Sequence, residues 1–172
     1  ASGMGLPLGG DTRERIFKVI FLDSGLMCAA LGLTLERASD LAGLVLVNEG
    51  GLAEQAVGQC LRASLPHFAE RSLYFWSSER HGAVAEVDYL IQHGTRIVPV
   101  EVKAGTTGSL KSLHHFMARR DLQLAVRVNA DLPSVTEVDV RTTEGVGVRY
   151  RLLSIPFYLA GQMSRVLGHL LP

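Results

Sequence analysis

Cysteine is scarce in this chain of 172 residues, which contains only Cys28 and Cys60. Two thiols in a chain of this size do not form a disulfide framework, so we expect a reducing, cytoplasmic setting. The two cysteines are far apart, and neither has a Cys or His partner at the spacing of zinc ligands. The shortage of cysteine therefore argues against both a disulfide-rich secreted domain and a metal finger.

An excess of either charge is also missing, because seventeen acidic residues balance seventeen basic ones. A neutral chain is a poor non-specific binder of nucleic acid, although a local basic rim is compatible with this balance. No apolar run reaches the roughly 18 residues that a membrane helix needs. The phosphate-binding motif G-x-x-x-x-G-K-[ST] is absent as well. We therefore expect neither membrane insertion nor ATP binding by this chain.

The sequence does contain the apolar periodicity of a globular domain, with 47% hydrophobic and 20% charged residues. Helical spacing predicts helices at residues 51–65, 109–120 and 155–170. Alternation predicts strands at residues 72–77, 83–92, 95–103, 122–129, 135–141 and 147–153. Helix, three strands, helix and strand in this order give a mixed β-sheet flanked by helices, so the predicted fold class is α/β.

A dense apolar stretch precedes this core. Residues 15–22 are predicted to form a strand, Asp23 to cap a short helix through about residue 31, and residues 34–42 to form a short helix or turn. Large exposed apolar patches usually mark interfaces. We expect residues 15–35 to contact either a missing module of a larger protein or a second copy of the chain.

The two strands beside His93 and Gly94 carry the acidic side chains of greatest interest. If these two residues form a hairpin turn, the facing pairs are Gln92–Thr95, Tyr89–Val98, Asp88–Pro99 and Glu86–Glu101. Side chains alternate between the two faces of a sheet. One face is then expected to carry Glu86, Asp88, Glu101 and Lys103, and the other Val87, Tyr89, Ile91, Val98, Val100 and Val102.

Carboxylates crowded on one patch repel one another, so such a patch destabilises the fold and is unexpected unless it serves a function. Asp88 and Glu101 would be diagonal neighbours, with Cβ atoms about 7 Å apart, and can share a hard divalent cation. Lys103 would orient a water or stabilise transition-state charge. The alternative is a solvated face on which Lys103 neutralises one acid. The two-sided apolar strand at 96–102 favours a buried site, whereas Pro99 favours an edge or a bulge.

These residues resemble the PD-(D/E)XK nuclease superfamily, whose pattern is an acid on a helix, an Asp on one strand and (D/E)-X-K on the next. The matching positions are Glu54, Asp88 and Glu101-Val102-Lys103, while Val87 stands where the pattern has Pro. The resemblance implies a restriction-endonuclease-like fold, with Asp88, Glu101 and Lys103 as catalytic residues. It also implies that Glu54, Asp88 and Glu101 bind Mg²⁺ or Mn²⁺. Glu54 borders the buried stripe of its helix. Its side chain is therefore compatible with two orientations, one toward the sheet and one toward solvent.

Longer blocks of sequence are similar to the C-terminal uncharacterised domain of a family of prokaryotic AAA-type ATPases. In chain order they are SGMGLPLGG, FKVIFLDSGL, GLAEQAVGQCLR, LYFWSSERHGAVAEVDYLI, RIVPVEVKAGTTGSLKSLHHFM and IPFYLAGQM. This resemblance implies that residues 41–172 form the nuclease-like domain and that residues 1–40 join it to an N-terminal ATPase module. The Gly-rich opening, which does not begin with Met, leads us to expect a piece of a larger intracellular protein.

Three functions follow as alternatives. The first is a metal-dependent phosphodiester hydrolase acting on DNA or RNA, and the intact acids and Lys103 favour it. The second is a non-catalytic module that binds DNA or a protein under control of the ATPase, and the zero net charge and the apolar N-terminal third favour it. The third is an oligomerisation domain. The helix at 109–120 carries basic side chains that either contact phosphates or simply face solvent: Lys111, His114, His115, Arg119 and Arg120.

Overall fold

The structure, a computed structural model, describes residues 2–3, 7–10, 12–13, 16–32, 49–68, 72–80 and 83–170. The strands are β1 (Ser2–Gly3), β2 (Thr12–Arg13), β3 (Tyr74–Arg80), β4 (Ala83–His93), β5 (Arg96–Val102), β6 (Leu124–Asn129), β7 (Ser134–Arg141) and β8 (Gly147–Pro156). The helices are α1 (Ser24–Ala30), α3 (Glu49–Ala63), α4 (Lys111–Arg120) and α5 (Met163–Leu170), with short 3-10 helices η1 (Leu8–Gly10) and η2 (Phe157–Gln162).

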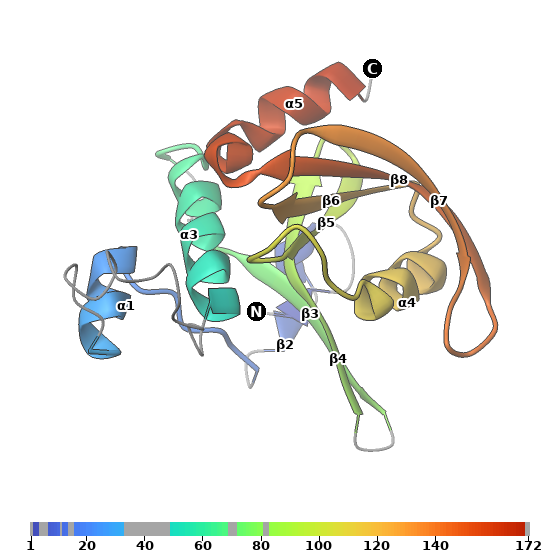
Figure 1. The fold of residues 1–172 in the computed structure, drawn as a ribbon, viewed down its shortest axis with the longest axis horizontal. Helices are drawn as coiled ribbons and strands as arrows, with labels where there is room; N and C mark the ends of the chain where they lie inside the picture. Colours follow the sequence, from blue (N-terminus) through green and yellow to red (C-terminus); the bar gives the residue numbers. More distant parts are fainter. Residues whose placement is uncertain are drawn as a thin grey trace.

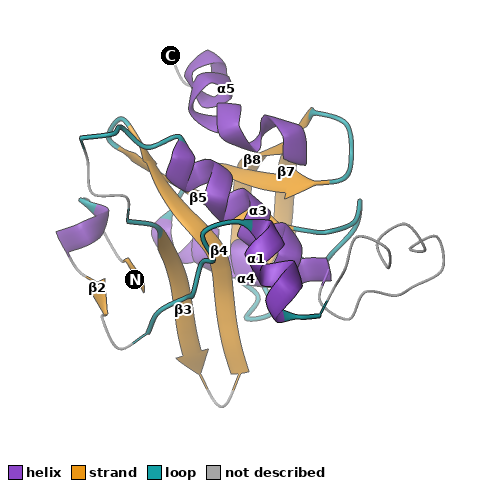
Figure 2. Ribbon diagram, turned by 90° about the vertical axis from the view of Figure 1, so that its left-hand side faces the viewer, coloured by secondary structure: helices purple, strands orange, loops and turns teal. Residues whose placement is uncertain are grey.

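One sheet of the order β2-β1-β3-β4-β5-β6-β8-β7 forms the centre of the molecule, and helices cover both of its faces (Figures 1 and 2). On one face, here called the α3 face, the buried side chains of α3, η2 and α5 pack on the sheet around Val57, Val100 and Leu167. On the other, the α4 face, Leu113 and Phe116 of α4 pack on a second buried cluster. The predicted mixed α/β sheet flanked by helices is confirmed.

β5 lies in the middle of this sheet because it is apolar on both sides. It pairs antiparallel with β4 and parallel with β6, and β6 pairs parallel with β8. Residues Val98 to Val102 of β5 are all buried, as expected for a strand with helices on both faces. Among the described residues, no helix has both the length and the apolar character that crossing a bilayer requires.

The prediction of a strand at residues 15–22 is wrong for residues 16–22, which are extended but pair with no strand. Their backbone groups bind side chains of α3 instead, since Gln55 contacts both Phe21 N and Val19 O at 2.8 Å. The helix cap at Asp23 is confirmed, because its carboxylate accepts from Leu26 N. The element expected at residues 34–42, and the domain boundary between residues 40 and 41, lie outside the described residues.

The closing helix predicted at residues 155–170 begins later than expected. Ile155 and Pro156 continue β8, because they pair with Val128 and Asn129 of β6. The chain then turns through η2 before α5 starts at Met163. The start of the closing helix is therefore set by the pairing of β8 with β6, and the apolar spacing alone places that start too early.

The hairpin between β4 and β5 turns one residue later than predicted. Its turn residues are Gly94 and Thr95, and His93 pairs with Arg96. Tyr89 therefore faces Val100 rather than Val98, and Gln92 faces Ile97 rather than Thr95; Asp88 and Glu86 lie beyond the pairs of this ladder. Gly94 has a φ of +59°, so the residue that tolerates this conformation takes the first of the two turn positions.

A β-bulge interrupts β4 where it pairs with β3. The pairs Tyr74–Leu90 and Trp76–Val87 leave one residue of β3 opposite two residues of β4. Side chains on either side of the bulge therefore change faces. Val87 packs in the cluster on the α4 face, whereas Tyr89 packs on the α3 face. The prediction that Val87 and Tyr89 share a face is wrong for this reason.

Candidate functional site

Three carboxylates converge beside the bulge on the α3 face. Glu54 comes from α3, while Glu86 and Asp88 come from β4, and their oxygens lie within 4.8 Å of one another. We call these three residues the acidic triad. The ammonium group of Lys18 contacts all of them, at 3.2 Å from Glu54 Oε2, 2.5 Å from Glu86 Oε1 and 3.6 Å from Asp88 Oδ1. A cation therefore already occupies the centre of the triad.

Asp88 is fixed by the end of the β4–β5 ladder. The last backbone pair of that ladder is Tyr89–Val100. Beyond that pair, Val102 N donates to Asp88 Oδ2 at 2.7 Å. The carboxylate thus serves as the acceptor for a buried backbone N–H. Its other oxygen faces Lys18, so Asp88 joins the triad to the strand that carries Glu101 and Lys103.

Glu101 and Lys103 form an adjoining pair. Lys103 Nζ donates to Glu101 Oε1 at 2.6 Å, and Glu101 Oε2 is buried with no hydrogen-bond partner among the residues that the structure describes. Glu101 alternates with Val100 and Val102, which pack on the α3 face, so its side chain leaves β5 on the α4 face. Gly108 lies against the stem of Lys103, because a Cβ there would be 2.6 Å from Lys103 Cδ. The loop after β5 therefore holds this lysine in place.

The acids influence one another's protonation. Burial raises the pKa of Glu54, and the charge of Asp88 adds to this, whereas Lys18 opposes it. Burial also raises the pKa of Asp88, against the opposing effect of the Val102 N–H and Lys18. Burial and the charge of Asp88 raise the pKa of Glu101 to about 7, although Lys103 lowers it. Burial lowers the pKa of Lys18, but the bond to Glu86 and the neighbouring carboxylates outweigh burial and raise it.

The sequence prediction located part of this arrangement. The structure brings the predicted Glu54 and Asp88 together and leaves Glu101 outside their group, paired with Lys103. The expectation that Glu86 and Glu101 share a face is wrong, because the bulge turns Glu86 toward α3 and Lys18. Lys18 was missed entirely. It is the single charged residue within the apolar run IFKVIFL. A lone charge in an apolar run was the feature of the sequence that could have indicated a partly buried, paired lysine.

Comparison with known proteins gives one match. Residues 49–146 match the model of a family described as Domain of unknown function (DUF4143). The chain belongs to this family. No curated protein and no solved structure matches it. The matched part of this DUF4143 domain includes the acidic triad, Glu101 and Lys103, whereas Lys18 precedes it.

The acidic triad has the donor chemistry of a hard divalent cation. Mg²⁺ and Mn²⁺ prefer carboxylate oxygens, and the triad of this DUF4143 domain presents at least one such oxygen from each of three side chains within 4.8 Å. Asp88 is almost fully buried and held by a backbone N–H, so one ligand is fixed before any ion binds. The residues present therefore fit a metal of this class.

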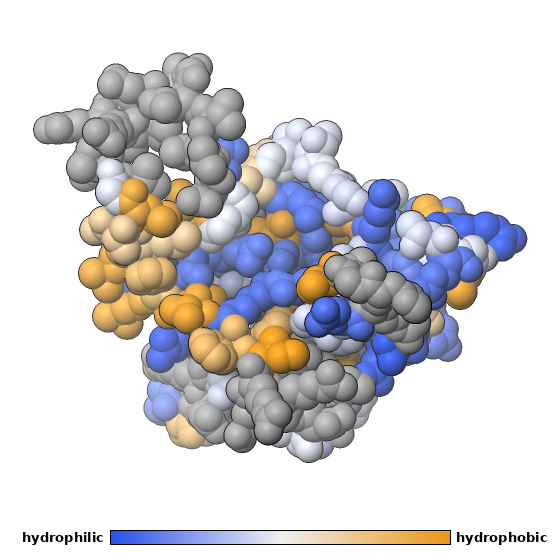
Figure 3. Space-filling model, turned by 90° about the horizontal axis from the view of Figure 1, so that it is seen from below, coloured by the Kyte–Doolittle hydropathy of each residue, from blue (hydrophilic) through white to orange (hydrophobic). Residues whose placement is uncertain are grey.

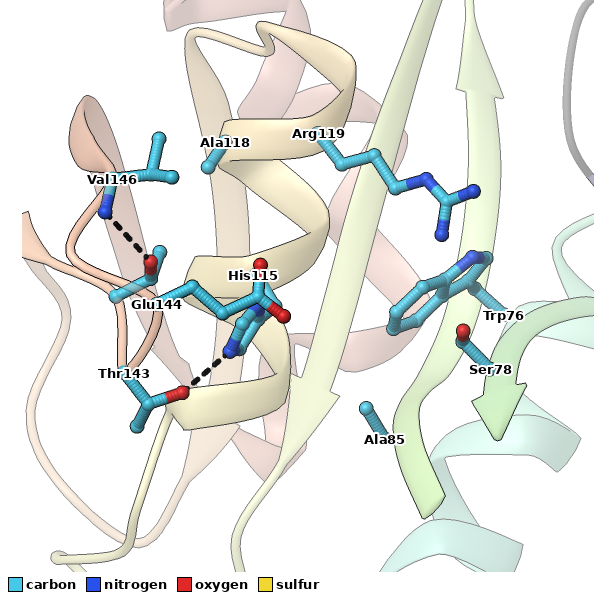
Figure 4. Close-up of a pocket in the computed structure, with 10 residues that line it drawn as sticks. Trp76, Ser78, Ala85, His115, Ala118, Arg119, Thr143, Glu144 and Val146 are labelled. Carbon is cyan, nitrogen blue, oxygen red and sulfur yellow. Dashed lines mark hydrogen bonds between the residues drawn. The ribbon is translucent and has the colours of Figure 1, made fainter. Parts of the chain in front are cut away.

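A cleft of about 520 Å³ lies elsewhere on this DUF4143 domain, between α4, the β3–β4 hairpin and the turn that joins β7 to β8. Polar and aromatic side chains line it, among them Trp76, Ser78, His115, Arg119, Thr143 and Glu144. Figure 4 shows Arg119 reaching from α4 toward Trp76, and His115 hydrogen-bonded to Thr143 at 2.7 Å. His114, a predicted phosphate contact, does not line this cleft. Its Nδ1 is instead hydrogen-bonded to Tyr150 Oη at 2.9 Å.

Apolar side chains are exposed along residues 16–31, which precede the part of the chain that matches the family. The largest exposed ones are Phe17, Val19, Leu22, Leu26 and Leu31. Figure 3 shows apolar surface gathered on the side where Figure 1 has α1, next to a hydrophilic band. The described part of the stretch expected to contact a partner is thus apolar at the surface.

Proposed function

We propose that this domain is a metal-dependent phosphodiester hydrolase of the PD-(D/E)XK nuclease type. The observation that supports it best is the placement of Asp88 within the acidic triad. Its Oδ1 faces Lys18, and its Oδ2 accepts a hydrogen bond from Val102 N, between Glu101 and Lys103. A metal ion at such a site would activate water and neutralise phosphate charge, and a nearby lysine would stabilise the charge that develops during hydrolysis of a phosphodiester. The mixed α/β sheet, with Glu54 on a helix and Asp88 and Glu101 on neighbouring strands, supports the proposal.

Each residue has a role in this proposal. Glu54, Glu86 and Asp88 hold Mg²⁺ or Mn²⁺ through carboxylate oxygens. A bound metal ion lowers the pKa of a coordinated water and neutralises charge on the phosphate. Lys103 orients the attacking water and stabilises the charge that develops on the phosphoryl oxygens. Glu101, predicted from sequence as a ligand, positions Lys103 through their 2.6 Å contact.

The test measures metal binding and cleavage separately. Titration of MnCl₂ by calorimetry should give weak binding to the unaltered chain and none to Asp88→Asn, which removes a charged ligand. The exposed acid Glu79 supplies a matched control, since Glu79→Gln should bind like the unaltered chain. Lys103→Met should bind Mn²⁺ but lose cleavage of labelled DNA and RNA, single-stranded and duplex. Equal binding to Asp88→Asn and the unaltered chain would rule out the triad as the metal site.

A second candidate is a binding module without catalysis, and the cleft beside α4 favours it. Guanidinium, imidazole, hydroxyl and indole groups together suit a phosphate and a base of single-stranded nucleic acid. Its volume of about 520 Å³ lies within the range of small-molecule sites. If metal binds at the triad and no nucleic acid is cut, while Arg119→Ala weakens binding of single-stranded DNA, this candidate is the better one.

We also propose that the exposed apolar side chains of residues 16–31 pack against the AAA-type ATPase module that the resemblance places before this domain. Exposed apolar area of this kind is typical of interfaces. Hydrogen exchange compares the domain alone with the full-length protein. Backbone amides of α1 should exchange more slowly in the full-length protein if the module covers them, and equal exchange would contradict the contact.

A further inference from the structure

Lys18 behaves as a cation tethered within the acidic triad. Its side chain is only 19% exposed and contacts one oxygen of each carboxylate. Its ammonium also lies 3.5 Å from the backbone oxygen of Asp88 and above the rings of Phe75 and Tyr89, at 5.4 and 5.7 Å from their centroids. Carboxylates, a carbonyl and aromatic faces are all groups that attract a cation. The position is therefore a cation site that the chain fills with its own residue.

A metal ion and this ammonium cannot occupy the triad together. Mg²⁺ needs carboxylate oxygens at about 2.0–2.1 Å in a near-octahedral arrangement. Lys18 Nζ already contacts an oxygen of each triad residue, at 2.5 to 3.6 Å. A divalent ion among these oxygens would face the positive charge of Lys18 at very short range. Binding of the metal thus requires Lys18 to leave.

The segment that carries Lys18 is held in a way that permits it to leave. Residues 16–22 pair with no strand among the described residues. Their backbone is bound by side-chain amides of α3, with Gln55 contacting Phe21 N and Val19 O, and Gln59 donating to Phe21 O at 3.4 Å. Of the apolar residues in this segment, Ile20 packs against the core, whereas Phe17, Val19 and Leu22 are exposed. Withdrawal of Lys18 therefore breaks its own contacts with the triad and the two rings, and displacement of the segment breaks only these side-chain hydrogen bonds and the packing of Ile20.

We propose that Lys18 is an exchangeable occupant of the acidic triad, which a divalent metal must displace. The segment 16–22 then sets the metal affinity of the domain and partly neutralises the triad when no metal is bound. This inference rests on the metal site of the proposed function. It adds that the site is self-inhibited by a residue outside the part of the chain that matches the family.

The first test compares Lys18→Met with Lys111→Met on the whole chain. Methionine keeps an unbranched stem and removes the charge, and Lys111 is an exposed lysine of α4 that serves as the matched control. Calorimetric titration with MnCl₂ should give a dissociation constant at least tenfold lower for Lys18→Met than for the unaltered chain. Lys111→Met should bind like the unaltered chain, and adding Asp88→Asn to Lys18→Met should abolish binding.

The second test needs no substitution, so it holds even if Lys18→Met fails to fold. Saturating MnCl₂ should speed hydrogen exchange at the Phe21 amide, which Gln55 protects, by at least tenfold. An amide in the core strand β6 should exchange at an unchanged or slower rate. Exchange at Phe21 that stays slow while Mn²⁺ binds in an Asp88-dependent manner overturns the displacement of Lys18.

The outcomes separate the two proposals. Equal or weaker Mn²⁺ binding by Lys18→Met, with binding still lost in Asp88→Asn, overturns the role of Lys18 and leaves the metal site intact. If neither Lys18→Met nor the unaltered chain binds Mn²⁺, the metal site itself is overturned, and the displacement of Lys18 by metal is overturned with it. Tighter binding by Lys18→Met together with faster exchange at Phe21 supports both.

Discussion

At the scale of single residues, Glu101 carries the largest electrostatic cost among the acids described here. It is 5% exposed, one oxygen is paired with Lys103, and the other has no hydrogen-bond partner in the described part of the chain. Burial and the charge of Asp88 raise its pKa from 4.5 to about 7. A carboxyl group with this pKa is partly protonated near neutral pH, and it becomes charged in the folded chain only as the pH rises past about 7.

This gives a prediction for the pH dependence of stability. Between pH 4.5 and about 7 the folded chain binds a proton at Glu101 that the unfolded chain has lost, so stability falls as the pH rises through this range. The full effect is roughly 3 kcal/mol. Glu101→Gln removes the titration and should therefore melt higher than the unaltered chain at pH 8, with the difference shrinking toward pH 5. A melting difference that does not change between pH 5 and 8 would show that Glu101 is not the source.

At the scale of elements, the packing of α3 on the sheet depends on a close approach at Gly58. Tyr89 Oη donates to the Glu54 carbonyl at 2.8 Å, which brings the ring under the helix. A Cβ at Gly58 would lie 2.5 Å from Tyr89 Oη and 3.2 Å from Ile20 Cδ1. The same glycine therefore sets how closely Glu54 approaches the triad.

Gly58→Ala should destabilise the fold. Alanine favours the helix by about 1 kcal/mol, but overpacking a core costs about 1–3 kcal/mol, so we expect a net loss in the free energy of unfolding. Gly50→Ala in the first turn of α3 is the control, because its Cβ meets open space, and it should not destabilise. Adding Tyr89→Phe to Gly58→Ala should recover part of the loss by removing the clashing oxygen. Urea denaturation of the unaltered chain and these three variants decides this, and a more stable Gly58→Ala would contradict the clash.

Most of these elements could be predicted from sequence, because burial imposes visible periods. β5 is apolar on both faces, and α3 and α4 show helical spacing of apolar residues, so their existence follows from composition and order. The bulge in β4 could not be predicted in this way. Glu86, Val87, Asp88 and Tyr89 alternate as a regular strand would, and the extra residue is evident only from the pairing with β3.

At the scale of the whole molecule, metal binding is linked to folding. An ion that binds only the folded chain stabilises it by about 2.7 kcal/mol at a concentration one hundred times the dissociation constant. For a chain of this size that raises the melting temperature by roughly 5–10 °C. We therefore expect saturating MnCl₂ to raise the melting temperature of the unaltered chain. The rise should be absent from Asp88→Asn, and an equal rise in both would place the ion elsewhere.

The candidate site was only partly predictable at this scale, because it combines three segments distant in sequence. Glu54 and Asp88 carried a recognisable pattern of helix and strand acids. Lys18 enters the site through the packing of residues 16–22 on α3, which depends on Gln55 and not on any strand pattern. Local periodicity predicts which face a residue occupies, but contacts between distant segments follow from tertiary packing.

The bulge in β4 also limits how the length of this chain can vary in evolution. Loss of one residue between Val87 and Leu90 would restore regular pairing with β3 and turn Glu86 to the α4 face, away from Lys18 and Glu54. Gain of a residue at the Gly94 or Gly145 turns would leave the faces of the strands unchanged. We expect relatives that keep the acidic triad to keep the number of residues from Glu86 to Leu90 constant, while the two turns differ in length. An alignment of the family that shows gaps within 86–90 in chains retaining all three acids would contradict this.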